Sequence, residues 1–367
     1  MIQRVMKSKI ITAIVALVIA ALMGLGYYNA AQHHAHKPAG EVDVKEIIFD
    51  HLGDTYGWEV PFNHSLSIPL PVIVWGQDGL HCFMSNRISG GETYKDYKIS
   101  TSEEHHGKVV QVLPDGSEYR PWDFSITKNV LGLFISAFIV VLMFMGLKRW
   151  YDRNGLKAPR GFKGALELVV DFVYTDTIRP ILGKHSPKYA PYLLTAFFFI
   201  LTMNLLGLIV IFPGGANLTG NIAVTFVLAL LTFLITNLSG TREYWKEIFW
   251  PDVPIMLKFP APIMPVVEML GIFTKPMALM IRLFANMMSG HMVVIVLVSL
   301  IFIFSTQFSV GVGAFTSFFS MFFTLFMLLL DTLISFIQAY VFMLLSAIFI
   351  SMALVEPHEH QAKELSN

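Results

Sequence analysis

Five long apolar runs constrain this chain more than any other feature of its sequence. A helix needs about 20 consecutive apolar residues to cross a bilayer, because each residue adds about 1.5 Å along its axis. The runs cover residues 126–147, 191–212, 221–238, 263–304 and 315–353. The last two exceed one straight crossing, so each is expected to be a long tilted helix or to contain a break. We therefore expect an all-α polytopic membrane domain of about five crossing helices, the last two forming a hairpin.

Composition supports a membrane location. Hydrophobic residues make up 54% of the chain and charged residues 14%, with a mean hydropathy of +0.60, whereas soluble domains average about 25% charged residues. The 26 basic and 26 acidic residues leave a net charge of zero, so no global field points to nucleic acid. The single cysteine, Cys82, excludes an intrachain disulfide and a multi-cysteine metal centre. We expect an integral membrane protein with no cofactor, no metal site and no nucleic-acid partner.

The residues before the first apolar run divide into two parts. Arg4, Lys7 and Lys9 precede a short apolar segment, which is typical of a signal peptide or an uncleaved N-terminal anchor over residues 1–30. Either interpretation keeps the basic residues in the cytoplasm and sends the following chain outside. Residues 31–122 are polar, and their strand-like runs LSIPLPVIVW and KVVQVLP are accompanied by turn signals such as LPDGS. This segment is expected to be a small external domain.

Loop charge predicts the orientation of the crossings. The loop between the first two runs holds nine basic residues and the loop before the fourth holds three, whereas PGGANLTGN and STQFSVGVGAFTS hold none. Because basic loops stay in the cytoplasm, the membrane domain, residues 123–355, is expected to end in a cytoplasmic tail, residues 356–367.

The first basic loop also predicts a helix that lies on the membrane surface. Over residues 162–182, apolar residues recur at helical spacing, with Glu167 and Asp171 on the opposite side. The expected apolar side consists of Leu166, Leu168, Val169, Phe172 and Val173.

Arg282 lies inside the fourth apolar run, although its guanidinium stays charged at any accessible pH. Placing it at the bilayer centre costs about 2.5 to 3.5 kcal/mol, so such a residue is usually kept for function. A helix turns by about 100° per residue, which places four further polar side chains on one stripe with Arg282. They are Glu268, Lys275, Asn286 and Ser289. His291 falls on another side of the helix.

The last apolar run holds a second polar stripe. Asp331 and Gln338 are seven residues apart and therefore lie nearly on one face, with Ser335 between them. Because lipid cannot solvate these groups, the two stripes are expected to face each other or a shared water-filled cavity. If helix tilt brings Asp331 and His291 together, the pair is a relay for protons. In the alternative, structural reading, Arg282 ties helices together and the last-run residues form interhelical hydrogen bonds.

These residues resemble a known family, subunit a of the rotary F-type ATP synthases. The segment KPMALMIRLFANMMSGHM, residues 275–292, is similar to the family's arginine helix with its R-L-F-x-N-x-x-x-G pattern. The segment beginning TLISFIQAYVF is similar to its last helix, with Gln338 at the glutamine position. GALELVVDFV and FFFILTMNLLGLI are similar too, so the resemblance covers about residues 123–360. Many bacterial members hold an acid where His291 stands and a histidine where Asp331 stands, and the exchanged order here is similar to mitochondrial-type members.

The resemblance implies a proton-translocating stator subunit, without catalytic activity of its own, that couples proton flow past a rotating c-ring to ATP synthesis. Arg282 then faces the ring carboxylates between two offset half-channels, with Gln338 as its partner across the helix hairpin. The expected proton-translocation residues are Arg282, Glu268, Asn286, Ser289, His291, Asp331 and Gln338. The expected partners are the c-ring, the b subunits of the peripheral stalk, the lipid bilayer and protons, in a bacterial inner membrane.

Two other functions remain open from the residues alone. A secondary ion transporter would pair Arg282 with an anionic substrate, although the internal repeats typical of that class are not seen in the sequence. A non-conducting membrane scaffold would bind partner helices through the polar stripes.

Overall fold

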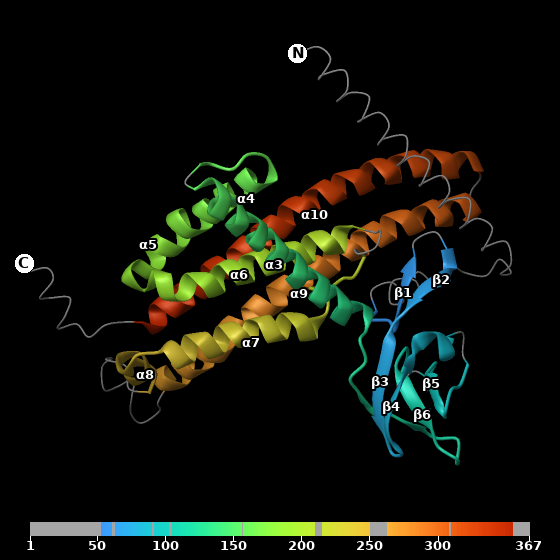
Figure 1. Ribbon diagram of the computed structural model, residues 1–367. Helices are drawn as coiled ribbons and strands as arrows, with labels where there is room; N and C mark the ends of the chain where they lie inside the picture. The colour runs from blue at the N-terminus through green and yellow to red at the C-terminus, as the bar shows by residue number, and fades with distance from the viewer. Residues whose placement is uncertain are drawn as a thin grey trace, which may run out of the picture. The chain divides into compact units, whose positions relative to one another are not determined.

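A computed structural model describes residues 53–60, 63–89, 92–102, 105–155, 157–209, 215–249, 263–307 and 310–354. The expected signal or anchor, residues 1–30, and the expected tail, residues 356–367, lie outside these described residues. The structure divides into two compact units, a β unit that runs to Leu131 and a helical unit that begins at Gly132 (Figure 1). Each unit is described by itself.

The β unit contains eight short strands within its described residues. They are β1 (Gly57–Val60), β2 (Asn63–Pro69), β3 (Pro71–Gly76), β4 (Gly79–Met84), β5 (Tyr97–Ile99), β6 (Val109–Val112), β7 (Glu118–Tyr119) and β8 (Trp122–Asp123). They form an antiparallel β1-β2 hairpin and two antiparallel sheets of order β4-β3-β8 and β5-β6-β7. The strand-like runs expected from the sequence are confirmed as β2, β3 and β6, and LPDGS forms the turn that leads to β7.

One face of the β4-β3-β8 sheet forms the core of the β unit. Side chains alternate between the two faces of a strand, so Val72, Val74 and Phe83 all point inward. There they pack in one cluster with Tyr97 of β5 and Val109 of β6.

A hydrogen bond adds a polar contact to this core. The hydroxyl of Tyr56 donates to the carboxylate of Asp123 at 2.5 Å. Burial, together with this carboxylate, raises the pKa of Tyr56. This hydrogen bond connects the segment before β1 with β8, the last strand of the β unit.

Helix α3 (Lys128–Asn154) begins where the β unit ends, and the β unit caps its first turn. The first N–H groups of a helix have no partner within the helix. Here the N–H of Lys128 donates to the carbonyl of Thr55 at 2.9 Å, and the N–H of Asn129 donates to the carboxylate of Asp54 at 3.2 Å. A carboxylate also suits the positive end of the helix dipole. Both bonds lie within the β unit, which runs to Leu131 and includes this first turn.

The helical unit continues α3 and adds the remaining helices. They are α4 (Phe162–Asp171), the π-helix η3 (Phe172–Ile178), α5 (Arg179–Leu182), η4 (Gly183–His185), α6 (Ser186–Leu208), α7 (Ile222–Ser239), α8 (Arg242–Phe249), α9 (Ile263–Gln307) and α10 (Val310–Ala353). Within the described residues, five helical stretches are long and apolar enough to cross a membrane. The expected polytopic helical fold is confirmed.

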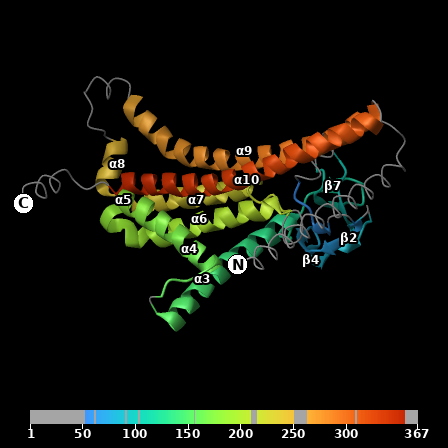
Figure 2. The ribbon, with the colours of Figure 1, turned by 90° about the horizontal axis from the view of Figure 1, so that it is seen from above.

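The expected loop STQFSVGVGAFTS is largely helical, so its predicted boundaries are wrong. α9 continues to Gln307 and α10 begins at Val310, which leaves residues 308–309 between them. Serine, threonine and glycine lower the hydrophobicity of this stretch, but they do not prevent the backbone from continuing a helix. α9 and α10 pack against each other and form the expected hairpin, although the first part of α9 curves away from α10 (Figure 2).

Both hairpin helices are long and unbroken. α9 has 45 residues and α10 has 44, and α9 continues through Pro276. At about 1.5 Å per residue each helix is about 66 Å long, twice the thickness of a hydrocarbon core of about 30 Å. Of the two sequence-based options, the long tilted helix is therefore favoured over a break.

The helix expected over residues 162–182 is confirmed in its bounds, but not every residue predicted for its apolar side lies on that side. α4, η3 and α5 follow one another directly and end at Gly183, whose φ of 51° favours glycine. Leu166 and Val173 are buried in the structure, whereas Leu168 and Phe172 are 71% and 39% exposed. Two residues along a helix correspond to a turn of about 200°, so Leu168 lies opposite Leu166 and its assignment to the apolar side is wrong.

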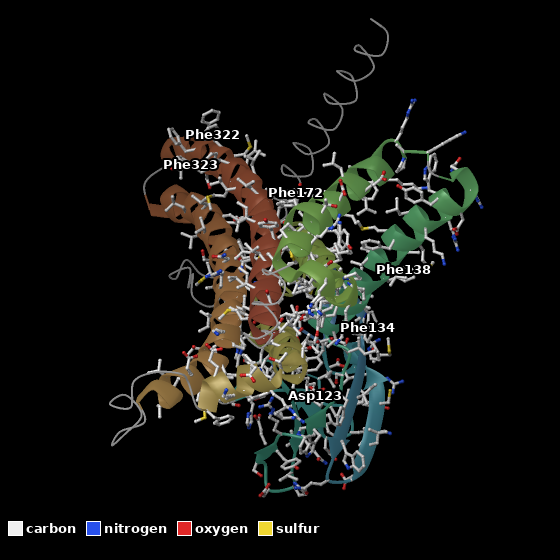
Figure 3. The ribbon with its side chains drawn as sticks, turned by 90° about the vertical axis from the view of Figure 1, so that its left-hand side faces the viewer. Asp123, Phe134, Phe138, Phe172, Phe322 and Phe323 are labelled. Atoms are coloured by element: carbon white, nitrogen blue, oxygen red, sulfur yellow. The ribbon has the colours of Figure 1, made fainter. Side chains whose placement is uncertain are left out.

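α10 makes the most extensive contacts of the helical unit. It packs against α9, α6, α7 and α5, and small side chains on it allow close approach. Those that are fully buried include Ser335, Ala339, Ser346 and Ala347. Phe322 of α10 and Phe138 of α3, in contrast, lie exposed on the outside of this unit (Figure 3). Such apolar surfaces are expected where lipid or partner helices cover a membrane protein.

Candidate functional site

Arg282 lies on the exposed side of α9. The residues that α9 buries in this part of the helix are Leu279, Met280, Leu283 and Met287. Arg282 is exposed, and apolar side chains on other sides of this part of α9, such as Met277 and Ile281, are exposed too. A permanent cation on a lipid-facing surface is costly, so this placement indicates a partner outside this chain.

Asn286, one turn after Arg282, connects the two polar stripes. Its side-chain amide donates to the side-chain oxygen of Gln338 on α10 at 2.7 Å. Gln338 is 4% exposed, so this bond satisfies a polar group that has left water. The stripes expected from residue spacing therefore meet at this pair. The pairing of Gln338 with Arg282 that the resemblance implies stays a prediction.

Asp331 packs against the backbone of α9 beside His291. The Asp331 side chain is buried, and a Cβ on Gly290 would lie 2.9 Å from its Oδ1. His291 follows Gly290 in α9 and faces α6, since its Nε2 would lie 3.6 Å from a Cβ on Gly207. Asp331 thus lies against Gly290, the residue before His291, and His291 itself lies against Gly207 of α6. Proton exchange between the two side chains stays a prediction.

Two buried polar residues that the sequence analysis missed extend this region. The amide of Asn204 on α6 donates to the carbonyl of Ser335 at 3.5 Å, and its oxygen accepts from the hydroxyl of Thr219 at 2.7 Å. The hydroxyl of Ser335 donates in turn to the carbonyl of Asp331 at 2.7 Å. A lone asparagine in an apolar run is a signal that could have found Asn204, whereas Thr219 stands in an uncharged loop and gives none. We call Asn204, Thr219, His291, Asp331 and Ser335 the α6-side cluster.

A second polar region lies toward the start of α9. A cavity between α7, α8, α9 and α10 has polar lining from Thr236, Asn237, Tyr244 and Lys275. Burial, with a smaller effect of the charge on Glu268, raises the pKa of Tyr244, which indicates that Glu268 is close to this cavity. The ammonium of Lys275 lies 5.8 Å from the centre of the Phe349 ring, within cation–π range. We call this region the α8-side cavity.

Arg282 separates the two polar regions along α9. It lies seven residues after Lys275 and nine residues before His291. At about 1.5 Å per residue, Lys275 and His291 are about 24 Å apart along the helix. Ser289, the remaining expected site residue, is exposed on α9. Within the described residues, no group of three or more His, Cys, Asp and Glu side chains is placed to hold a metal ion.

Fold and site together define a class of protein. It is a multi-pass helical membrane protein in which an exposed arginine lies, along one helix, between two polar regions that are enclosed by helices.

Comparison with known proteins identifies the family. The family described as ATP synthase A chain matches residues 130–351. ATP synthase subunit a of Chloroherpeton thalassium is 41% identical over 249 residues, which cover 66% of this chain and 70% of the relative. That of Myxococcus xanthus is 41% identical over 264 residues, covering 70% and 80%. ATP synthase subunit a 2 of Chlorobaculum tepidum is 38% identical over 258 residues, covering 68% of each chain.

This chain therefore belongs to the ATP synthase A chain family. The β unit has a separate match, because residues 47–124 correspond to a family described as a domain of unknown function. The family membership shown by the helical unit consequently says nothing about what the β unit does.

Proposed function

We propose that this chain is the proton-translocating stator subunit of an F-type ATP synthase. The observation that carries the proposal is the exposed Arg282 on α9, whose charge calls for an acidic group outside this chain. A c-ring whose carboxylates pass this surface supplies such a group. The chain has no catalytic activity of its own and acts as one component of the complex.

A fixed guanidinium controls the protonation of a passing carboxylate. It favours the ionised form of a carboxylate beside it, so a ring carboxylate that reaches Arg282 releases its proton. Because arginine does not release its own proton, it also blocks a direct leak between the two polar regions. A membrane potential supplies about 2.3 kcal/mol per elementary charge per 100 mV, and this energy turns the ring.

The two polar regions are suited to form the two half-channels. Both place polar side chains in otherwise apolar surroundings, and they lie on opposite sides of Arg282 along α9. We assign the α8-side cavity, with Glu268, to the cytoplasmic half-channel and the α6-side cluster to the external one. Ser289 lies on α9 between Arg282 and the external half-channel.

Two contacts support specific roles near the arginine. The hydrogen bond from Asn286 to Gln338 fixes α9 against α10 one turn from Arg282. The close packing of Asp331 on Gly290 keeps a carboxylate beside His291. An acid and an imidazole in neighbouring positions pass protons in either order, so we assign the relay of the external half-channel to His291 and Asp331.

The partners and orientation follow from this role. We assign the c-ring to the exposed Arg282 side of the hairpin and propose the b subunits as further partners. The basic loops place the C-terminus in the cytoplasm and the β unit outside, in a bacterial inner membrane.

Replacing Arg282 by lysine tests the proposal. Lysine keeps a positive charge but is a compact ammonium that loses its proton when buried, so Arg282→Lys is expected to abolish proton-driven ATP synthesis while the complex still assembles. Inverted membrane vesicles with an imposed proton gradient measure the rate, and immunoblotting of the purified complex measures assembly. Arg242→Lys, the same replacement at an exposed position of α8 outside the lining of the cavity, is the matched control and should leave the rate unchanged. Native rates in Arg282→Lys would reject the central role of the arginine, as expected for a scaffold.

A double exchange tests the relay. His291→Asp combined with Asp331→His restores an acid–imidazole pair and is expected to retain more proton-driven ATP synthesis than either single replacement. The three variants are compared in the same vesicles at equal assembly. If the double variant is as inactive as the single variants, the two residues do not act as a pair.

A further inference from the structure

The outer face of the β4-β3-β8 sheet carries a row of exposed apolar side chains. Strand register places Trp75 of β3 opposite Leu80 of β4 and also opposite Trp122 of β8. The three side chains therefore lie side by side on one face of the sheet. They are 58%, 63% and 72% exposed, respectively.

Further apolar residues extend this row over the same face. Cys82 is exposed and pairs with Ile73, two positions along from Trp75. Phe124 is 60% exposed, and its N–H donates to the carbonyl of Ile73. Met84, also exposed, pairs with Pro71 at the next position. We call Pro71, Ile73, Trp75, Leu80, Cys82, Met84, Trp122 and Phe124 the outer apolar face.

The β unit does not need this face for its own folding. Its core is made by the inner side of the same sheet, where Val72, Val74 and Phe83 pack against the second sheet. Contiguous apolar patches larger than a few hundred Å² are rare on water-exposed surfaces and mark sites of interaction. The outer apolar face is therefore expected to be covered by something outside the β unit.

The chain places this face close to the membrane boundary. α3 has 27 residues, about 40 Å at about 1.5 Å per residue, so it is longer than a hydrocarbon core of about 30 Å and its first turn reaches the headgroup region. Phe124 stands four residues before that turn, a distance that chain geometry limits to about 14 Å. The hydrogen bonds of Asp54 and Thr55 to the first turn hold the β unit there.

The composition of the face matches this location. Tryptophan is enriched where membrane meets water, because its ring is apolar and its N–H remains able to bond to water or headgroups. The face contains two exposed tryptophans, Trp75 and Trp122. Both alternate along their strands with residues of the inner side, Val74 and Asp123, so the sheet presents the aromatic side outward by its own geometry.

We propose that the outer apolar face lies in the headgroup region of the lipid bilayer, which makes the β unit a membrane-bound domain. This location does not depend on proton conduction, only on α3 as a membrane helix.

Cys82 provides a built-in probe, because it is the single cysteine of the chain and lies on this face. The full chain is labelled at Cys82 with bimane maleimide and reconstituted into phosphatidylcholine–phosphatidylglycerol vesicles. Fluorescence is then quenched either by lipids with a headgroup nitroxide or by aqueous iodide. The matched control is Cys82→Ser with Asp115→Cys, which moves the label to an exposed turn between β6 and β7.

The proposal expects nitroxide lipids to cause a larger loss of fluorescence at position 82 than at position 115, and iodide to cause a smaller loss. If both positions respond alike and only to iodide, the face lies in water and the proposal is overturned. Shielding of position 82 from both quenchers would show that protein covers the face, and would overturn it too.

A second variant connects the signal to the face itself. Trp75→Ser with Trp122→Ser changes two exposed side chains and leaves the inner core intact, so the β unit should still fold. It is expected to reduce nitroxide quenching at Cys82 and to raise iodide quenching. Unchanged quenching at Cys82 would exclude the tryptophans as the residues that hold the face in the bilayer.

Discussion

At the residue scale, the packing of Asp331 against Gly290 leaves no room for a side chain on that glycine. An added Cβ would lie 2.9 Å from Oδ1 and 3.2 Å from Cγ of Asp331. At Gly207, on the other side of His291, an added Cβ would meet its nearest atoms at 3.4 to 3.6 Å, which is ordinary van der Waals contact. The two glycines therefore form a matched pair for mutation.

We expect Gly290→Ala to lower proton-driven ATP synthesis and Gly207→Ala to leave it near the native rate. Overpacking a tight site costs about 1 to 3 kcal/mol, and at Gly290 the strain falls on the position of the Asp331 carboxylate. If the strain reaches the proton-transfer barrier, about 1.4 kcal/mol slows the reaction about tenfold. ATP synthesis by membrane vesicles at a fixed proton gradient measures the effect. Equal rates in the two variants, at equal assembly, would contradict a role for the Asp331 position.

Residue spacing predicted part of this site and missed the rest for a physical reason. The helical period predicts Asn286 on the Arg282 stripe and His291 on another side of α9. In the structure Asn286 bonds to Gln338 of α10, whereas His291 lies against Gly207 of α6. Spacing within one helix contains no information about partners on another helix. The contact of Gly290 with Asp331 and the hydrogen bond of Thr219 to Asn204 depend on how α6, α9 and α10 pack, so they could not be read from the sequence.

At the element scale, the β5-β6-β7 sheet contains a carboxylate with several partners. Glu118 accepts hydrogen bonds from the hydroxyls of Ser100 at 2.6 Å and Ser102 at 3.0 Å, and it pairs with the ammonium of Lys98 at 2.9 Å. These contacts lower the pKa of Glu118 from 4.5 to about 2, and the hydrogen bond from Ser100 has the largest effect. The ionised form is therefore favoured by the folded sheet.

Glu118→Gln is expected to weaken this sheet at neutral pH but not in strong acid. Because the folded-state pKa is lowered, the stabilisation by Glu118 is complete above its unfolded pKa of about 4.3. It is lost as the pH falls toward the folded value of about 2. Hydrogen exchange of β5, β6 and β7 in the full chain, corrected for intrinsic rates, measures the opening of the sheet. If the difference in hydrogen exchange between native and variant protein is as large at about pH 2 as at about pH 7, the ionised carboxylate of Glu118 is not its cause.

Element types were predictable here, whereas several boundaries were not. Apolar runs predicted all five helical stretches that, within the described residues, are long and apolar enough to cross a membrane, because lipid demands continuous hydrophobicity and internal hydrogen bonds. The same criterion ended α9 too early and began α10 too late, since polar and glycine residues near the hairpin turn remain helical. Leu168 of α4 was wrongly predicted on the same side as Leu166 because it is apolar. Its position two residues along the helix places it on the opposite, exposed side.

At the scale of the whole molecule, the alternation of basic and neutral loops predicts which ends lie outside. In a Cys82→Ser background, Asp115→Cys in the β unit is expected to react with a membrane-impermeant maleimide in intact cells. Lys157→Cys, in the first basic loop, is expected to react only after the cells are permeabilised, because basic loops stay in the cytoplasm. Both positions are exposed in the structure, so a lack of reaction reports the membrane barrier. Reaction of Lys157→Cys in intact cells would reverse the proposed orientation.

The hydrogen bonds between the β unit and α3 also have a consequence for biogenesis. Ribosomes make the chain from its N-terminus, so Asp54 and Thr55 are synthesised more than seventy residues before Lys128 and Asn129, the residues whose N–H groups they accept. The first turn of α3 therefore completes its hydrogen bonding only after the β unit has folded on its own side of the membrane. Under the proposed orientation, folding of the exported β unit would therefore come before the final seating of the first membrane helix.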